Sequence, residues 1–465
     1  MHRTRADRFS GIIRTRLRAE PKPHYVTPPM NVLGWINAPQ QSLAQWDELV
    51  ALAAAARADG LDHTLVCGMG GSSLVADVLA ETFRKNELHV LDSTNPDAVC
   101  AAERAHDLSR TLLLVASKSG NTVETLAFCN YFLSRARPEQ FIAITETGTP
   151  LDALGRERGF RAVLPHPPNV GGRYSALTAI GMLPAALLGI DGRTLLERTG
   201  GVDVKAAKAF GVAIADRAMA GRDKLVLAPP RQVDGLAQWV EQLVAESSGK
   251  DGRGVIPIVH DPVRAARPDM QSVGPQEIPS DPLDLGMEFL RWEYATQALC
   301  ERLGVNAFDQ PDVDEAKRLA RAELTGVKES GPLPTLSLET LRRSARPGDY
   351  CAILAYLPPG PQVLAELQGV RAAWGKALNC ATTLGFGPRY LHSTGQLHKG
   401  GPNTGLFLVI TADTREDMPI PGMAWTFGEL HRAQARGDVR ALLARGRRVA
   451  HVHLSSLAEI AQLHP

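Results

Sequence analysis

The sequence has 465 residues, 44% of them hydrophobic and 22% charged, which is an ordinary composition for a globular protein. Because single domains usually stop growing near ~250 to 300 residues, the length excludes one common core and predicts two domains. The formal net charge of +1 gives no general electrostatic reason to bind nucleic acid or an anionic membrane, so an anion would need a local site.

The amino-terminal segment is the most basic part of the chain. Its arginines are opposed only by Asp7 and Glu20, and the apolar stretch of a secretory signal is missing. A targeting segment is the alternative, but the charge pattern favours a solvated arm, followed by a helix, over residues 1–45.

The six cysteines are scattered, without a CxxC pair or a His/Cys cluster at metal-ligand spacing. This spacing favours a reducing compartment, the cytoplasm, and argues against a structural metal. No run of about 18 or more apolar residues occurs, so the sequence predicts no membrane-spanning helix.

Strand-like apolar runs recur through the first half, and most are followed by a helical stretch. They cover residues 64–67, 88–91, 111–115 and 141–145. Strands that alternate with helices form parallel sheets with helices on both faces. We therefore predict a doubly wound α/β domain over residues 46–200, with its ligand site outside the carboxyl ends of the strands.

A second series of apolar runs follows in the second half. Its members cover residues 224–228, 350–355, 406–410 and 449–454. A Pro- and Gly-rich passage over about 255–282 and a helix-like stretch over 285–303 separate the first run from the others. We predict a second doubly wound α/β domain over residues 201–465, with a helical insertion near 283–330.

Two loops have the composition of anion-binding sites. GMGGSS at residues 68–73 follows the first run directly, and its glycines allow a ligand to approach the free amides at a helix start. A tight turn without a ligand would look similar. SKSGNT at residues 117–122 is more specific, because several hydroxyl and amide side chains crowd a helix start where capping needs only one. Two such loops suit one phosphate monoester, and the absence of GxGxxG and GxxxxGK[ST] disfavours a nucleotide.

Five segments, in order, resemble the motifs of the glucose-6-phosphate isomerase family, which has the sugar-isomerase fold. They are residues 68–72 (GxGGS), 117–122 (SKTxxT), 171–175 (GGRxS), 242–250 (QxxxESxGK) and 306–317 (NPFDQPGVExxK). The chain resembles most closely the isomerase half of bifunctional transaldolase/glucose-6-phosphate isomerases. Its length leaves no room for a transaldolase barrel, so we predict no transaldolase activity.

The resemblance implies catalytic roles for four residues. Glu246 would be the base that moves a hydrogen between C2 and C1, with Gln242 beside it on the same helix face. Arg173 would place a permanent cation beside the enediolate oxygens. Lys317 and His392 would share ring opening. Without the resemblance, each would be interpreted as a solvated helix or loop residue.

Further residues would bind the substrate. The resemblance assigns this role to Gln242 and to residues of the two loops: Gly71, Ser72, Ser117, Lys118, Ser119 and Thr122.

The histidine assignment departs from the family pattern. The family has a GQHxFxQLxHQG segment between the fourth and fifth motifs, and nothing like it occurs there in this chain. YLHSTGQLHKG at residues 390–400 follows the fifth motif instead, and aligning its QLH with QLxH places His392 on the catalytic histidine. The second domain would then be permuted in chain order. His260 and His398 are alternatives.

The sequence therefore predicts an aldose–ketose isomerase that interconverts glucose 6-phosphate and fructose 6-phosphate through an enediol, without a metal or other cofactor. The resemblance also implies a homodimer. A phosphosugar-binding regulatory module would keep the two loops but would not need Glu246 or Lys317. A dual glucose/mannose 6-phosphate isomerase would show the same motifs.

Overall fold

The computed structural model describes residues 30–263, 266–325 and 333–465. Most of the predicted basic arm falls on residues 1–29 and lies outside the described residues. The described chain begins with short turns and then helix α1 (Ala38–Ala58).

The first half forms a five-stranded parallel sheet in the order β2-β1-β3-β4-β5. Its strands are β1 (His63–Gly68), β2 (Leu88–Leu91), β3 (Thr111–Ala116), β4 (Phe141–Thr145) and β5 (Ala162–Pro165). The four strands predicted in this half are confirmed. The fifth, β5, has only partly buried and exposed residues, so it lacks the apolar run that marks a buried strand.

Helices cover both faces of this sheet. They are α2 (Leu74–Thr82), α3 (Pro96–Ala105), α4 (Val123–Leu133), α5 (Pro150–Arg158), α6 (Ala179–Leu187) and α7 (Gly192–Arg198), together with α1. Alternate side chains of a strand point to opposite faces. Accordingly, Leu112 and Leu114 pack in one hydrophobic cluster with α1, α2 and α6, whereas Leu113 and Val115 pack in another with α3, α4 and α5. The predicted doubly wound class is confirmed.

The strands of the second half form two parallel sheets, in the orders β7-β6-β8 and β10-β9-β11-β12. The smaller sheet contains β6 (Lys224–Leu227), β7 (Ile256–Val259) and β8 (Met270–Val273). The larger contains β9 (Tyr350–Tyr356), β10 (Ala381–Phe386), β11 (Gly405–Ala412) and β12 (Arg448–Leu454). The sequence grouped the run near residue 224 with the three later runs. In the structure it pairs with none of them.

The Pro- and Gly-rich passage over residues 255–282 contains two strands that the sequence did not predict, β7 and β8. Each strand has only four residues, Pro257 interrupts the apolar run of β7, and Ser272 is exposed in β8. Their pairing with β6 is a tertiary effect that so short a pattern does not reveal.

The helices of the second half are α8 (Val204–Met219), α9 (Leu236–Ser248), α10 (Leu285–Leu303), α11 (Pro311–Leu324), α12 (Leu338–Arg343), α13 (Pro361–Leu378), α14 (Gly395–Gly400) and α15 (Phe427–Ala444). Helix α10 spans the predicted residues 285–303. Val439 and Leu442 of α15 pack on one face of the larger sheet, and Leu367 and Trp374 of α13 pack on the other. None of the helices in the described ranges is long and apolar enough to cross a bilayer.

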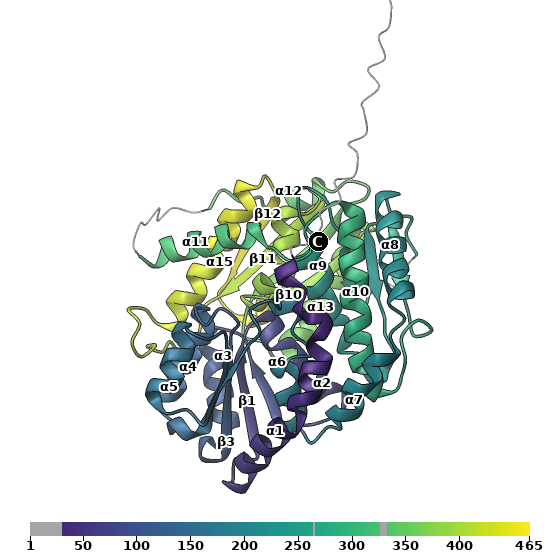
Figure 1. The fold of residues 1–465 in the computed structure, drawn as a ribbon. Coiled ribbons are helices and arrows are strands. Elements are labelled where there is room, and N and C mark those ends of the chain that lie inside the picture. Colours follow the sequence, from purple (N-terminus) through teal and green to yellow (C-terminus); the bar gives the residue numbers. More distant parts are fainter. Residues whose placement is uncertain (1–29, 264–265, 326–332) are drawn as a thin grey trace, which may run out of the picture.

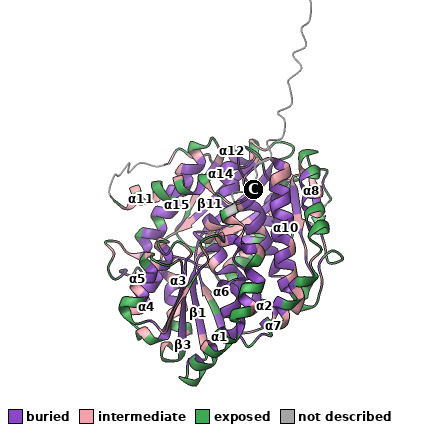
Figure 2. Cartoon of the chain, in the orientation of Figure 1, coloured by how far each residue is buried: buried purple, intermediate pink, exposed green. Residues whose placement is uncertain are grey.

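The first sheet and the larger second sheet lie in separate parts of the molecule, with β1 and β3 below β11 and β12 in the view of Figure 1. The strands are buried, and exposed residues lie mainly on the outward sides of the helices (Figure 2). Gly68, the last residue of β1, is in register with Ala116, the last residue of β3. The two loops with the composition of anion-binding sites, residues 68–73 and 117–122, therefore leave the sheet side by side. We call them the phosphate-type loops.

Glu293 is a carboxyl group buried in the core on α10. Its side chain has no accessible surface, and neither oxygen has a hydrogen-bond partner among the described residues. Burial raises the pKa of Glu293 well above its usual value. Because the folded state then binds a proton that the unfolded state releases, this group makes stability fall as pH rises above the unfolded pKa of about 4.3.

Replacing Glu293 by Gln removes this titration. We expect Glu293→Gln to gain stability over the original protein as the pH rises from about 5 to 8, and the gain to vanish below about pH 4. Urea unfolding at a series of pH values measures the difference. A difference that is the same at every pH would contradict the argument.

Candidate active site

An ion pair between Arg173 and Glu246 lies where the first half meets α9. Arg173 Nη1 is 2.9 Å from Glu246 Oε1, and the two side chains are 4% and 13% exposed. Gln242, one turn earlier on α9, donates from Nε2 to Glu246 Oε2 over 3.0 Å. The predicted base, cation and amide therefore lie together, and both carboxylate oxygens of Glu246 have a defined partner.

The remaining guanidinium N–H groups of Arg173 are also used. Nε donates to Ser247 Oγ (2.9 Å), Nη1 to Gln310 Oε1 (3.1 Å), and Nη2 to the carbonyl oxygens of Ala307 (2.8 Å) and Asp309 (2.9 Å). Three of these four partners belong to residues 306–310, the start of the fifth motif. This segment therefore fixes the direction of the Arg173 side chain.

Lys250, the last residue of the fourth motif, holds the same segment. Its Nζ lies 3.0 Å from Asp309 Oδ1 and donates to the Asn306 carbonyl oxygen. Burial, reinforced by the nearby charge of Arg173, lowers the pKa of Lys250. The sequence did not lead us to assign Lys250 or Gln310 to the site, although Lys250 ends the fourth motif and Gln310 lies in the fifth.

Glycines allow the loop after β1 to touch the other parts of the site. A Cβ added at Gly71 would collide with the carbonyl oxygen of Gly172, next to Arg173. At Gly70, which has φ +54°, it would collide with the carbonyl oxygen of His392 and the amide of Gln242. Gln242 Nε2 also donates to the His392 carbonyl over 2.7 Å.

The loop after β3 places hydroxyl groups at the start of α4. Ser117 Oγ and Thr122 Oγ1 are 2.9 Å apart, and the Gly120 amide donates to Ser117 Oγ over 3.1 Å. Thr122 is the N-cap residue, but its side chain makes no capping hydrogen bond. Its hydroxyl and the free amides of the first helical turn can therefore bind an anion.

The other predicted binding residues belong to these two loops. Lys118 Nζ lies 3.5 Å from Glu146 Oε1, and Ser119 is exposed and donates to Asn121 Oδ1 over 2.7 Å. Ser72, at the end of the turn after β1, is partly buried.

A second acid–base pair joins the first half to the segment after β10. His392 Nε2 lies 2.9 Å from Glu124 Oε1, and Glu124 lies only two residues after Thr122. An ionised carboxylate only accepts hydrogen bonds, so His392 Nε2 carries the hydrogen and Nδ1 is the nitrogen free to exchange a proton with a ligand. Burial raises the pKa of Glu124, but the charge and hydrogen bond of His392 and the charge of Lys317 outweigh it, leaving the pKa below its usual value.

Glu124 was missed by sequence reasoning. A glutamate in the first turn of a helix is favoured by the helix dipole alone, so the residue has an ordinary structural explanation. Its position directly after the phosphate-type loop was the available signal.

Lys317 is exposed and pairs with a carboxylate on its own helix. Its side chain on α11 is 55% exposed, and Nζ is 3.3 Å from Asp314 Oδ1. Its charge still contributes to lowering the pKa of Glu124. Within the described residues, no hydrogen bond or ion pair joins Lys317 to the His392–Glu124 pair, so the structure does not hold Lys317 in the buried cluster.

The two alternative histidines lie elsewhere. His398 is 2% exposed among the rings of Tyr350, Tyr390 and Phe407, and burial lowers its pKa well below the usual value. It is therefore a neutral core residue.

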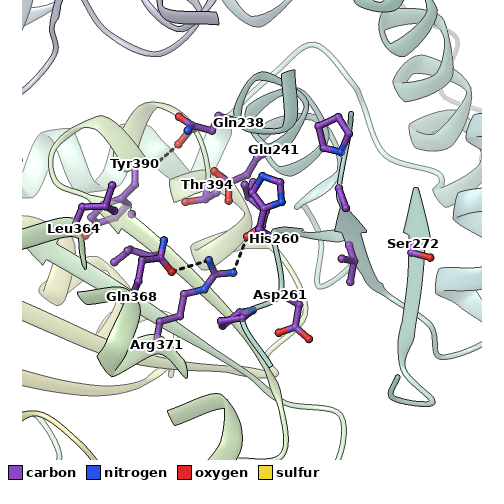
Figure 3. Close-up of a pocket in the computed structure, with 18 of the residues that line it drawn as sticks. Gln238, Glu241, His260, Asp261, Ser272, Leu364, Gln368, Arg371, Tyr390 and Thr394 are labelled. Carbon is purple, nitrogen blue, oxygen red and sulfur yellow. Dashed lines mark hydrogen bonds between the residues drawn. The ribbon is translucent and has the colours of Figure 1, made fainter. Parts of the chain in front are cut away.

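His260 lines a large cavity that is distinct from the cluster around Glu246. The cavity measures about 1210 Å³, and His260, Glu241 and Arg371 lie in its wall (Figure 3). His260 Nε2 is 2.9 Å from Asp234 Oδ1. Neither Glu246 nor His392 lines this cavity. Among the residues that the structure describes, no group of three or more His, Cys, Asp and Glu side chains could hold a metal ion.

Acid–base pairs beside phosphate-type loops, on doubly wound parallel sheets, define a protein of the sugar-isomerase fold class. Comparison with known families is consistent with this class. Residues 15–209 match the family model of phosphoglucose isomerase.

Individual relatives match a similar share of the chain. Glucose-6-phosphate isomerase from Nostoc sp. is 33% identical over 221 residues, which is 42% of this chain and 41% of the relative. The enzyme of that name from Desulfitobacterium hafniense is 32% identical over 215 residues, 41% of this chain and 40% of the relative. The chain thus spans about two fifths of the length of these curated relatives.

A solved structure extends the likeness in fold beyond this region. The crystal structure of a glucose-6-phosphate isomerase from Chlamydia trachomatis superposes with a TM-score of 0.52 at 19% sequence identity. The match covers 63% of this chain and 75% of that one.

The two histidine positions make different predictions. His392 contacts Glu124, which lies directly after the loop at residues 117–122, whereas His260 contacts Asp234 in the wall of the separate cavity. We therefore expect only His392→Ala to impair the opening of a cyclic sugar phosphate. We expect a loss of about 10²-fold or more for His392→Ala and little change for His260→Ala. Turnover of fructose 6-phosphate by each purified variant measures this. A loss confined to His260→Ala would reverse the assignment.

Proposed function

We propose that the chain interconverts glucose 6-phosphate and fructose 6-phosphate. The observation that carries this proposal is the Glu246 carboxylate, which is held through one oxygen by Arg173 and through the other by Gln242. An aldose–ketose shift needs one base that reaches two neighbouring carbons and a cation beside their oxygens. Both groups are present, and the loop after β1 contacts the segments that carry them.

The substrate phosphate would bind at the start of α4. Ser117 and Thr122 would donate hydroxyl hydrogen bonds, and the amides of the first turn would donate alongside them. The glycine loop at Gly70 and Gly71 would receive the sugar backbone, because it lies against the turn that carries Arg173.

Ring opening would use the His392–Glu124 pair. His392 Nδ1 would exchange a proton with the ring oxygen while Glu124 stabilises the positive charge on the imidazole. Lys317 would add positive charge on the exposed side of the same pair. These roles agree with those implied by the family resemblance.

Isomerisation would then take place on the open chain. The Glu246 carboxylate removes the proton from C2 of the aldose, and the electrons form a C1–C2 double bond while the C1 oxygen becomes negatively charged. The hydroxyl proton on the C2 oxygen passes to the C1 oxygen, and the same carboxyl group returns its proton to C1 to give the ketose. Arg173 would stabilise the negative charge on the oxygens of this intermediate, because its guanidinium is always charged.

We further propose that the chain acts as a homodimer in the cytoplasm, where this reaction belongs to glycolysis and gluconeogenesis, and that its two domains divide near residue 200. The cysteines support a reducing compartment, since all six are free and buried.

Replacing Glu246 by Gln tests the proposed base. The amide is nearly isosteric but cannot accept the carbon-bound proton, so we expect kcat to fall by about 10²- to 10⁴-fold with little change in phosphate affinity. Loss of solvent deuterium exchange at C2 should accompany it.

The matched control is Glu241→Gln on the same helix. Burial raises the pKa of Glu241 to about 7, but the side chain lies in the separate cavity, so this variant should keep its turnover. Undiminished activity of Glu246→Gln would remove Glu246 from the mechanism. Binding of fructose 6-phosphate without turnover by the original protein would instead favour a phosphosugar-binding module.

Replacing Ser117 and Thr122 together by Ala tests the phosphate site. Hydrogen bonds to a charged group contribute roughly 1.5 to 3 kcal/mol each, so KM for sugar 6-phosphates should rise by an order of magnitude or more. Steady-state kinetics and inhibition by 6-phosphogluconate measure the change, with Ser134→Ala at the other end of α4 as the control. Unchanged KM and unchanged inhibition would place the phosphate elsewhere.

A further inference from the structure

Helix α15 has a buried polar face. His431, Gln434 and Asp438 are three and seven positions apart and therefore lie on one side of the helix. They are 4%, 4% and 1% exposed. Buried polar side chains are costly unless they are hydrogen-bonded, so their partners indicate what this face stabilises.

Gln434 holds the carboxylate of Glu124. Its Nε2 donates to Glu124 Oε1 over 2.6 Å, the same oxygen that lies 2.9 Å from His392 Nε2. The Oε1 atom of Gln434 accepts a hydrogen bond from Thr94 Oγ1, also over 2.6 Å. The amide of Gln434 is thereby fixed in one orientation, with its NH₂ group toward Glu124.

His431 completes this chain of hydrogen bonds. Thr94 has one hydroxyl hydrogen and donates it to Gln434, so His431 Nδ1, 3.2 Å from Thr94 Oγ1, must be the donor in the second contact. Burial lowers the pKa of His431 to about 4, which agrees with a neutral ring that carries its hydrogen on Nδ1. Each donor and acceptor from His431 to His392 then has a defined direction.

Asp438 stabilises the segment that carries His392. Its Oδ2 accepts a hydrogen bond from the Tyr390 hydroxyl at a distance of 2.5 Å. Its Oδ1 forms an ion pair with Lys399 Nζ, also at 2.5 Å. These two residues lie on either side of His392 in the sequence. The same helix face therefore contacts both the carboxylate and the histidine segment of the pair.

We propose that Gln434, oriented by Thr94, is a positioning residue for the His392–Glu124 pair. It holds the Glu124 carboxylate where Oε1 accepts from His392 Nε2, so that Nδ1 faces the ring oxygen of the substrate. This inference rests on the proposed function and deepens it, because Gln434 acts through Glu124 and His392 rather than on the sugar.

Gln434→Met and Thr94→Val test the inference, since each keeps approximate size and removes a hydrogen-bonding group. With fructose 6-phosphate, kcat should fall roughly 10- to 100-fold at nearly constant KM, because the lost hydrogen bond bears on a charged group. With 5-deoxyfructose 6-phosphate, which lacks the ring-forming hydroxyl, kcat should change by less than about twofold. In a His392→Ala background, Gln434→Met should cause no further loss.

Gln140 and Thr111 provide a matched control pair at the amino-terminal ends of β3 and β4. Both are buried, and Gln140 Nε2 donates to the Thr111 carbonyl over 3.0 Å. Gln140→Met and Thr111→Val should lower stability without changing the ratio of the two rates. Equal losses on both substrates, or a loss that adds to that of His392→Ala, would overturn the inference.

A readout without turnover separates this inference from the proposed function. The Nε2 proton of His392 should give a downfield NMR signal that moves upfield or broadens in Gln434→Met but not in Gln140→Met. If the original protein turned over neither substrate, the proposed function would fail, and this signal would still decide the role of Gln434. An unchanged signal in Gln434→Met would overturn it.

Discussion

The structure depends on one buried guanidinium group. Arg173 follows the first sheet, and its partners Glu246, Ser247 and residues 306–310 all come from the second half of the chain. A buried charge that loses its partners costs several kcal/mol, so the docking of the two halves and the geometry of Glu246 depend on each other. The site is therefore a product of the interface between the halves.

Much of the fold was predictable because it is encoded locally. The buried strands β1 to β4 are continuous apolar runs, and the glycines and hydroxyl side chains that follow β1 and β3 have local reasons for their positions. Strands β7 and β8 were not predictable, since four residues with a proline or an exposed serine carry little pattern. Their sheet exists because β6 pairs with both of them.

The site divides in the same way. Glu246 and Gln242 are one helical turn apart, so the sequence placed them together. Glu124 meets His392 across 268 positions and Gln434 across 310, and no local periodicity contains such contacts. The segment that carries His392 follows the fifth motif in the chain, and the His392 carbonyl accepts a hydrogen bond from Gln242 of the fourth motif.

The central claim is that Glu246 moves a proton between adjacent carbons of a sugar phosphate. The most direct measurement is proton NMR of fructose 6-phosphate incubated with the purified chain in deuterated water. The account predicts that glucose 6-phosphate forms and that deuterium from the solvent enters it at C2. Binding of fructose 6-phosphate without conversion and without deuterium incorporation would contradict it.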